Sequence, residues 1–249
     1  MKTIVQACCG NGCKSAHTSQ QVCEERVLPE AGYEIEKQHI KMQSTTNITT
    51  LFLDIGEVLL TNGWGHDFRS LAAEKFNFDF NDFDTRHAIA FETYESGKLT
   101  MDGYLDIAVF YEPRDFTKDE FRQFMFSQSK PYPEMIDLIK RVKKRYGLKI
   151  IAVSNEAKEL NTYRIQQFEL AGLIDFFVSS AYVHIRKPDM DIYKLALDMA
   201  QVQPDEVLYI DDTAVFITIA ESLCIKGIWH VNYETTCKKL QSFGFETTV

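Results

Sequence analysis

Residues 49–60, TTLFLDIGEVLL, place a single aspartate, Asp54, at the end of an apolar run and shortly before a glycine turn. The run is rich in β-branched and aromatic residues, a composition that favours a buried strand. Two explanations of Asp54 are open from this stretch alone. It is either a polar residue where a strand leaves the core, or a nucleophile at the mouth of an α/β sheet.

From residue 49 onward, short apolar runs alternate with amphipathic segments. The runs predict five strands, and their near-continuous apolar character is typical of a parallel sheet that is buried on both faces. They are TLFLDI, LKIIAVSN, DFFVSS, VLYIDD and IKGIWHV. In PEMIDLIKRVKKRYG, apolar residues recur at helical spacing, Pro133 suits the first turn and Gly147 suits the end. The alternation predicts an α/β fold with a doubly wound, Rossmann-like parallel sheet.

One connection is too long for this alternation. About 95 residues separate Asp54 from the run that begins near Lys149, whereas a βαβ crossover needs only about 10–12. The residues from 65 to 127 read as several helices, so we expect them to form a helical cap inserted after the first strand. The α/β core is then expected to comprise residues 49–64 and 128–249.

Residues 1–48 differ in composition from the rest of the chain. They are polar, lack a clear helical or strand period, and contain four of the six cysteines. The residues that resemble zinc ligands here are Cys8, Cys9, Cys13, His17 and Cys23. They lack the paired CxxC spacing of strong zinc motifs. We therefore expect a flexible N-terminal extension, which would not be made at all if translation began at Met42.

Charge and hydropathy limit the classes of partner. The 249-residue chain carries a formal net charge of −9 and has no stripe of basic residues, which argues against binding to nucleic acid or to anionic membranes. It contains neither a run of about 18 apolar residues nor a secretory signal. Its cysteines are not distributed as a disulfide framework, so we expect a cytoplasmic protein. Monomer and homodimer are both open.

Polar residues fall at the carboxyl ends of the predicted strands or on the loops that follow them. In chain order they are Asp54, Ser154, Asn155, Lys187, Asp211 and Asp212. Each alone is as easily explained as a strand-ending turn or a helix cap. Because ligands of open parallel sheets bind beyond the carboxyl ends of the strands, four elements that bring acids, a hydroxyl, an amide and a cation to this edge indicate a site.

These segments resemble the four motifs of the haloacid dehalogenase (HAD)-like hydrolase superfamily, in order, over roughly residues 49–235. The motifs are DIGEVLL, VSN, RKP and YIDD. The stretch FETYESGKLTMDGY resembles the cap segment of a subgroup that contains sugar-1-phosphate phosphatases and the phosphatase domain of soluble epoxide hydrolase. The resemblance implies a Mg²⁺-dependent phosphatase of a small phosphorylated metabolite.

The resemblance also implies a role for each residue. Asp54 would attack phosphorus to give an aspartyl-phosphate, and Lys187 would offset the developing negative charge. Ser154 and the amide of Asn155 would hold phosphoryl oxygens, with Arg186 as a candidate substrate contact. The implied magnesium ligands are the Asp54 carboxylate, the Gly56 carbonyl and Asp212, with Asp211 beside them as an alternate ligand.

Two positions depart from the pattern of the family. Gly56 stands where many members have a second aspartate as general acid, and Phe216 stands where an Asn or Asp is common. The neighbouring Glu57 is a candidate proton donor. Because general acid catalysis is typically worth about 10²–10⁴-fold, its loss favours activated esters or anomeric phosphates as substrates.

The departures leave two other functions open. A non-catalytic relative that keeps the fold as a binding or interaction protein would explain both Gly56 and Phe216. A metal-free 2-haloacid dehalogenase would also lack the second aspartate, although its chemistry does not need the metal site that Asp211 and Asp212 supply. Trp64 and His66 are expected to line the cap side of the site. The other histidines, at 87, 184 and 230, read as surface or packing residues.

Overall fold

The computed structural model describes residues 46–248. The candidate zinc ligands in the first 23 residues and Met42 lie outside the described residues. Across the described part of the chain, every helix is too short or too polar to cross a lipid bilayer.

The core contains a five-stranded sheet in which each pair of neighbouring strands is parallel, in the order β3-β2-β1-β4-β5. The strands are β1 (Thr50–Leu53), β2 (Lys149–Ser154), β3 (Phe176–Ser179), β4 (Val207–Asp211) and β5 (Lys226–Trp229). Each of the five predicted runs contains one of them. β1 lies at the centre, where Thr50 is level with Lys149 on one side and Val207 on the other.

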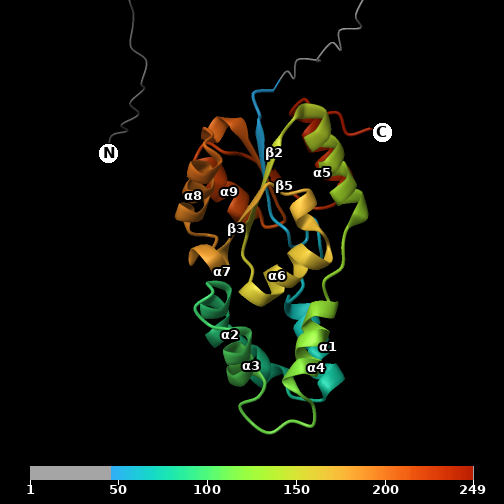
Figure 1. Cartoon of the computed structure of the whole chain (residues 1–249), viewed down its shortest axis with the longest axis vertical. Helices are drawn as coiled ribbons and strands as arrows, with labels where there is room; N and C mark the ends of the chain where they lie inside the picture. Colours follow the sequence, from blue (N-terminus) through green and yellow to red (C-terminus); the bar gives the residue numbers. More distant parts are fainter. Residues whose placement is uncertain (1–45, 249) are drawn as a thin grey trace, which may run out of the picture. The chain divides into compact units, whose positions relative to one another are not determined.

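Helices cover both faces of the sheet, which confirms the doubly wound α/β fold (Figure 1). One face packs against α5 (Pro133–Tyr146) and α10 (Tyr233–Ser242), the other against α8 (Met190–Ala200) and α9 (Ala214–Ser222). Side chains alternate along a strand, so Leu51 and Leu53 belong to the first face and Phe52 to the second. The remaining core elements are α6 (Lys158–Gln167), α7 (Ser180–Val183) and two 3₁₀ turns, Leu170–Gly172 and Pro204–Glu206.

Four helices are inserted between β1 and α5 and form the cap predicted from the long connection. They are α1 (His66–Phe76), α2 (Phe80–Glu95), α3 (Met101–Ala108) and α4 (Lys118–Ser127). Their inward faces build a separate, aromatic-rich apolar cluster that includes Phe83, Tyr104 and Phe121. Ala157 and Leu160, at the start of α6, belong to the same cluster, so the cap packs against the core beyond the carboxyl ends of the strands (Figure 1).

The two linkers that join cap and core run side by side. The backbone N–H of Thr61 donates to the Lys130 carbonyl at 2.9 Å, and the Lys130 N–H donates to the Thr61 hydroxyl at 3.0 Å. The Tyr132 N–H donates to the Leu59 carbonyl at 2.9 Å. The chain therefore leaves the core and returns to it at neighbouring, hydrogen-bonded positions.

Candidate active site

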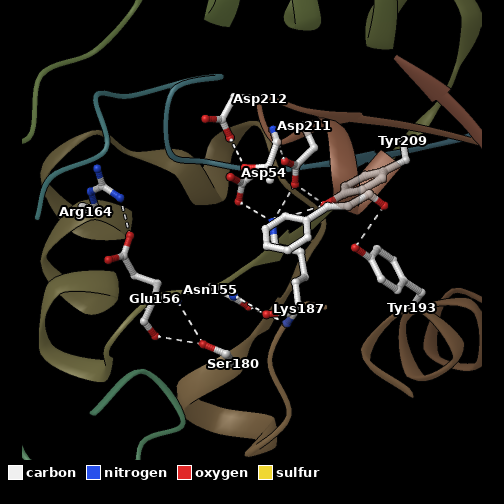
Figure 2. A network of polar contacts seen from close by, with 12 residues as sticks. Asp54, Asn155, Glu156, Arg164, Ser180, Lys187, Tyr193, Tyr209, Asp211 and Asp212 are labelled. Atoms are coloured by element: carbon white, nitrogen blue, oxygen red, sulfur yellow. Dashed lines mark hydrogen bonds and ion pairs between the residues drawn. The ribbon is translucent and has the colours of Figure 1, made fainter. Parts of the chain in front are cut away.

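Asp54 and Asp211 meet where the order of the strands reverses along the chain. Asp54 follows β1, Asp211 ends β4, and these two strands are neighbours. The Asp54 N–H donates to the Ile210 carbonyl at 2.9 Å, which keeps the first strand paired with β4 to its last residue. The two carboxylates are thus side by side at the switch point of the sheet, where open α/β folds bind their ligands (Figure 2).

Lys187, on the loop between α7 and α8, brings a cation to these carboxylates. Its Nζ lies 3.1 Å from Asp54 Oδ1 and 2.6 Å from Asp211 Oδ2, and its side chain is 1% exposed. Burial alone would disfavour the charge, but the carboxylates of Asp54 and Asp211 outweigh it and raise the pKa of Lys187. Lys187 is therefore a permanent cation beside Asp54.

Both carboxylate oxygens of Asp211 accept hydrogen bonds from other residues of the chain. Oδ2 accepts hydrogen bonds from Lys187 and from the Tyr209 hydroxyl, and Oδ1 accepts one from the Thr213 N–H at 2.7 Å. This arrangement suits a residue that orients Lys187 better than one that binds a metal directly.

The acidic cluster carries more negative charge than its lysine neutralises. Asp54, Asp211 and Asp212 each offer an oxygen, and these oxygens lie within 4.8 Å of one another. Burial, assisted by repulsion from Asp54 and Asp211, raises the pKa of Asp212 to about 6, and burial also raises the pKa of Asp54. Asp54 Oδ1 is buried and, apart from its ion pair with Lys187, has no polar partner among the described residues. A divalent cation with a preference for oxygen, such as Mg²⁺, fits both this charge and these donors.

Ser154 is the last residue of β2 and Asn155 follows it, next to Asp54 and Lys187. Ser154 is buried in the cavity lining, and its hydroxyl opposes only slightly the effect of burial, which raises the pKa of Asp54. The Asn155 side chain donates to the Lys187 carbonyl and accepts from the Lys187 N–H, both at 2.8 Å. Its side-chain amide therefore holds the lysine loop, so any contact of Asn155 with a phosphoryl oxygen falls to its backbone N–H.

The turn after Asp54 differs from the sequence interpretation. The left-handed residue is Glu57, with φ 52°, and not Gly56. A Cβ built on Gly56 would lie 3.9 Å from Asp54 Oδ2, so position 56 faces the Asp54 carboxylate but brings no acid to it. The Glu57 carboxylate turns away from the cavity, accepting hydrogen bonds from the Asn62 N–H at 2.6 Å and the Tyr132 hydroxyl at 2.8 Å. We do not retain Glu57 as a proton donor or substrate contact.

A cavity of about 370 Å³ opens in front of Asp54 between core and cap. Its cap-side wall consists of Trp64, Arg69, His87, Phe91, Tyr94 and Glu95. Trp64 thus lies where the sequence predicted, whereas His66 is outside the cavity lining and its ring is exposed. His87 is a buried wall residue hydrogen-bonded to the Tyr104 hydroxyl at 2.9 Å, and burial lowers its pKa to about 4.

Two ion pairs that the sequence did not reveal flank the cavity. Arg186 binds Glu95 of the cap at 2.8 Å. Arg164, 1% exposed, pairs with Glu156 (Figure 2), and burial raises the pKa of Glu156 to about 7 against the opposing charge of Arg164. An acidic residue after a strand end and an arginine within a helix are common in any sequence, so neither residue predicts a buried ion pair.

Phe216, the second departure from the family pattern, lies against the lysine. Its ring lines the cavity, and Lys187 Nζ is 5.0 Å from the ring centroid. An aromatic face attracts a buried cation, so Phe216 stabilises Lys187 without supplying another carboxylate or amide.

The site and the parallel sheet define a HAD-type α/β hydrolase. Residues 48–221 match the family model of haloacid dehalogenase-like hydrolases, and the chain belongs to this family, as its motifs predicted.

Solved structures show the same fold at low sequence identity. A HAD family enzyme from Bacteroides thetaiotaomicron superposes with a TM-score of 0.63 at 19% identity, covering 73% of this chain and 92% of that one. That enzyme is also known in complex with magnesium and inorganic phosphate (TM-score 0.61, 18% identity, 73% and 93% covered). L-2-haloacid dehalogenase from Xanthobacter autotrophicus has a TM-score of 0.54 at 15% identity, with 78% and 83% covered. The fold therefore accommodates more than one chemistry.

A curated relative shares part of the sequence. Bifunctional epoxide hydrolase 2 from Sus scrofa is 33% identical over 73 residues, which is 29% of this chain. The match spans only 13% of that relative's length.

Proposed function

We propose that the chain is a Mg²⁺-dependent phosphatase that hydrolyses a small organic phosphate through an aspartyl-phosphate at Asp54. One observation carries the proposal. Asp54 lines a cavity within a cluster of three carboxylates, and one of its buried oxygens lies 3.1 Å from the buried Lys187. Phosphoryl transfer needs an oriented nucleophile with positive charge beside it; Lys187 supplies part of this charge, and the carboxylates would hold the metal ion that supplies the rest.

The chain's own residues account for both halves of the reaction. A carboxylate oxygen of Asp54 attacks phosphorus, the bond between phosphorus and the alcohol oxygen breaks, and the alcohol leaves with a proton from solvent. Water then attacks the phosphorus of the acyl phosphate, which releases inorganic phosphate and restores the carboxylate. Lys187 and the backbone N–H of Asn155 stabilise the charge that develops on the phosphoryl oxygens. The Asp54 and Asp212 carboxylates and the Gly56 carbonyl would hold Mg²⁺, with Asp211 beside them, and the ion would supply the remaining charge neutralisation.

Position 56 restricts the leaving group. No acid faces Asp54 from this position, and Glu57 is turned toward Asn62 and Tyr132. An alcohol that is already a good leaving group, such as the anomeric hydroxyl of a sugar 1-phosphate or a phenol, needs less protonation. We therefore propose a preference for such esters over simple alkyl phosphates.

The substrate is proposed to be a small metabolite. A cavity of about 370 Å³ suits one small molecule, and the net charge of −9 opposes binding of nucleic acid or anionic membranes. The arrangement of cysteines supports a reducing compartment, and we propose the cytoplasm.

The test is hydrolysis of p-nitrophenyl phosphate with Mg²⁺ and with EDTA, by the wild type, Asp54→Asn and the control Asp137→Asn. Asp137 is an exposed carboxylate on α5, outside the cavity lining. Turnover that needs Mg²⁺, is lost in Asp54→Asn and persists in Asp137→Asn is the expected result.

The same preparations separate the two alternatives. Release of chloride from 2-chloropropionate in EDTA, without phosphatase activity, would identify a dehalogenase. A folded wild type that turns over neither compound would identify a non-catalytic relative.

A further inference from the structure

Three residues that line the cavity each carry a buried side-chain atom that forms no hydrogen bond within the described residues, although the first of these atoms is ion-paired with Lys187. The first is Asp54 Oδ1, the proposed nucleophile, and the other two are the Tyr94 hydroxyl and Arg186 Nε. Buried polar groups are satisfied in most proteins, because an unpaired one costs stability. Two unpaired hydrogen-bond donors on residues that line the same cavity as Asp54 therefore point to a ligand.

Packing holds the Tyr94 ring in place, and the Tyr94 hydroxyl takes no part in holding it. Tyr94 lies near the end of α2, is 3% exposed, and stacks on Tyr104 with ring centroids 4.5 Å apart and planes 9° from parallel. Tyr104 is fixed in turn by the Trp64 Nε1–H and by His87, each 2.9 Å from its hydroxyl. Burial raises the pKa of Tyr94, so its hydroxyl keeps its proton.

Arg186 is fixed by its other nitrogens. Its two terminal nitrogens bind Glu92 at 3.4 Å and Glu95 at 2.8 Å, and its guanidinium carbon lies 4.9 Å from the centroid of the Phe91 ring. The Nε–H is the one donor of this side chain that is buried without a partner.

Apart from Lys187, the described residues that line the cavity offer hydrogen-bonding dipoles and no unpaired positive charge. Among the arginines that line it, Arg186 is paired with Glu95, Arg164 with Glu156, and Arg69 with Asp84. His87 is held neutral because burial lowers its pKa to about 4. A second anionic group on the substrate would meet the Glu95 carboxylate and would find no unpaired cation beside it, whereas a hydroxyl oxygen would only accept hydrogen bonds.

We propose that the Tyr94 hydroxyl and the Arg186 Nε–H donate hydrogen bonds to uncharged oxygen atoms of the substrate's alcohol portion. The protein thereby selects monophosphates of hydroxylated, neutral alcohols over phosphates that carry a second anionic group. This inference rests on the proposed phosphatase function and names its substrate class.

The first experiment compares Tyr94→Phe with a matched control, Tyr163→Phe. Tyr163 also stacks on an aromatic ring, that of Phe126, at 4.6 Å and 11°, but it lies outside the cavity lining. For each protein, kcat/KM is measured with Mg²⁺ for glucose 1-phosphate, which carries hydroxyls, and for phenyl phosphate, whose alcohol portion has no further oxygen. Tyr94→Phe is expected to lower the ratio of the two values about tenfold, the usual effect of one lost hydrogen bond, and Tyr163→Phe to leave it unchanged.

Thermal unfolding of the same variants tests a purely structural role. Because the Tyr94 hydroxyl has no partner in the protein, Tyr94→Phe is expected to melt no lower than the wild type. A lower melting temperature with an unchanged substrate ratio would overturn the inference, as would equal losses for both substrates. In those cases wild-type turnover would still support the phosphatase. A wild type that hydrolyses neither compound would overturn both proposals.

The second experiment tests neutrality with the wild type alone. Glucose 1-phosphate and glucuronic acid 1-phosphate share the same leaving oxygen and differ by a carboxylate at the far end of the sugar. Like charges in a confined site are costly, so kcat/KM is expected to favour glucose 1-phosphate by about tenfold or more. Equal values, or a preference for the acid, would refute the selection against a second anion.

Discussion

Replacing Arg164 with methionine should destabilise the protein in a pH-dependent way. Arg164 connects three parts of the structure. It pairs with Glu156, its Nε donates to the Ser129 hydroxyl at 3.1 Å, and it also donates to the Thr61 carbonyl. Thr61 and Ser129 lie on or beside the two linkers between cap and core, and Glu156 follows the strand end that carries Ser154.

The magnitude follows from the burial of the pair. Removing one partner of a buried ion pair typically costs about 3–5 kcal/mol, because the other charge is left uncompensated. Glu156 already has its pKa raised from 4.5 to about 7 with Arg164 in place. Without Arg164, burial acts alone and the pKa of Glu156 rises further.

The sign of the pH dependence is set by this raised pKa. A carboxyl with a higher pKa in the folded state binds its proton more tightly there, so stability decreases as pH rises from 4.5 to about 7, by about 3 kcal/mol for such a shift. Near pH 5 folded Glu156 is protonated with or without Arg164. The cost of Arg164→Met should therefore be about 3–5 kcal/mol at pH 8 and smaller at pH 5 by up to about 1.4 kcal/mol, the equivalent of the one pH unit between the wild-type pKa of about 7 and pH 8.

Urea unfolding followed by circular dichroism at pH 5 and pH 8 measures this difference directly. The double variant Arg164→Met, Glu156→Met removes both charges and should recover most of the loss at pH 8, since apolar replacements of a buried pair are often neutral. A loss that is equal at both pH values, with no recovery in the double variant, would show that Arg164 acts through packing and not through Glu156.

Three further predictions concern other parts of the molecule. Gly97→Ala should lower the free energy of unfolding by about 3 kcal/mol or more, because the added Cβ would lie 2.0 Å from the Ala181 carbonyl oxygen. The control Gly147→Ala has a similar φ but nothing within 4 Å of the added Cβ, so it should cost about 1 kcal/mol. Urea unfolding measures both values. His87 has its pKa lowered from 6.5 to about 4, so it stabilises the fold above pH 6.5 and loses about 3 kcal/mol as pH falls through 4; an NMR titration with a midpoint near 6.5 would contradict this. Mg²⁺ at about a hundred times its dissociation constant should stabilise the wild type by about 2.7 kcal/mol in calorimetry, and an equal effect on Asp212→Asn would remove Asp212 from the metal site.

The sheet could be predicted from the sequence because its signals are local. A buried parallel strand needs a short apolar run, and α5 begins at Pro133 and ends before Gly147, where the sequence placed its limits. The meeting of Asp54, Lys187 and Asp211 followed from one rule, that parallel strands present their carboxyl ends at one edge.

The rest of the site depends on the directions in which side chains point, and no local sequence pattern contains this information. Glu57 points away from the cavity for two reasons. Its backbone is left-handed, and its carboxylate accepts a hydrogen bond from Tyr132, a residue distant in sequence. Arg164 is buried within α6, where helical periodicity would count any arginine as a solvent-facing residue. Tyr94 lies on the cavity wall because cap and core meet there, and that packing is not visible in either segment alone.

The two linkers between core and cap are hydrogen-bonded to each other, so the chain leaves the core and returns to it at neighbouring positions. Because Thr61 and Lys130 hydrogen-bond to each other, the ends of the segment from 65 to 127 are already joined before any cap helix is considered. The length and sequence of that segment can change without shifting the register of β1 against β2 or β4. The proposed nucleophile, Asp54, lies on the core and one of the two proposed substrate donors, Tyr94, lies on the cap, so a cap transplanted between the same two linkers should change the substrate preference and leave the reaction centre unaltered.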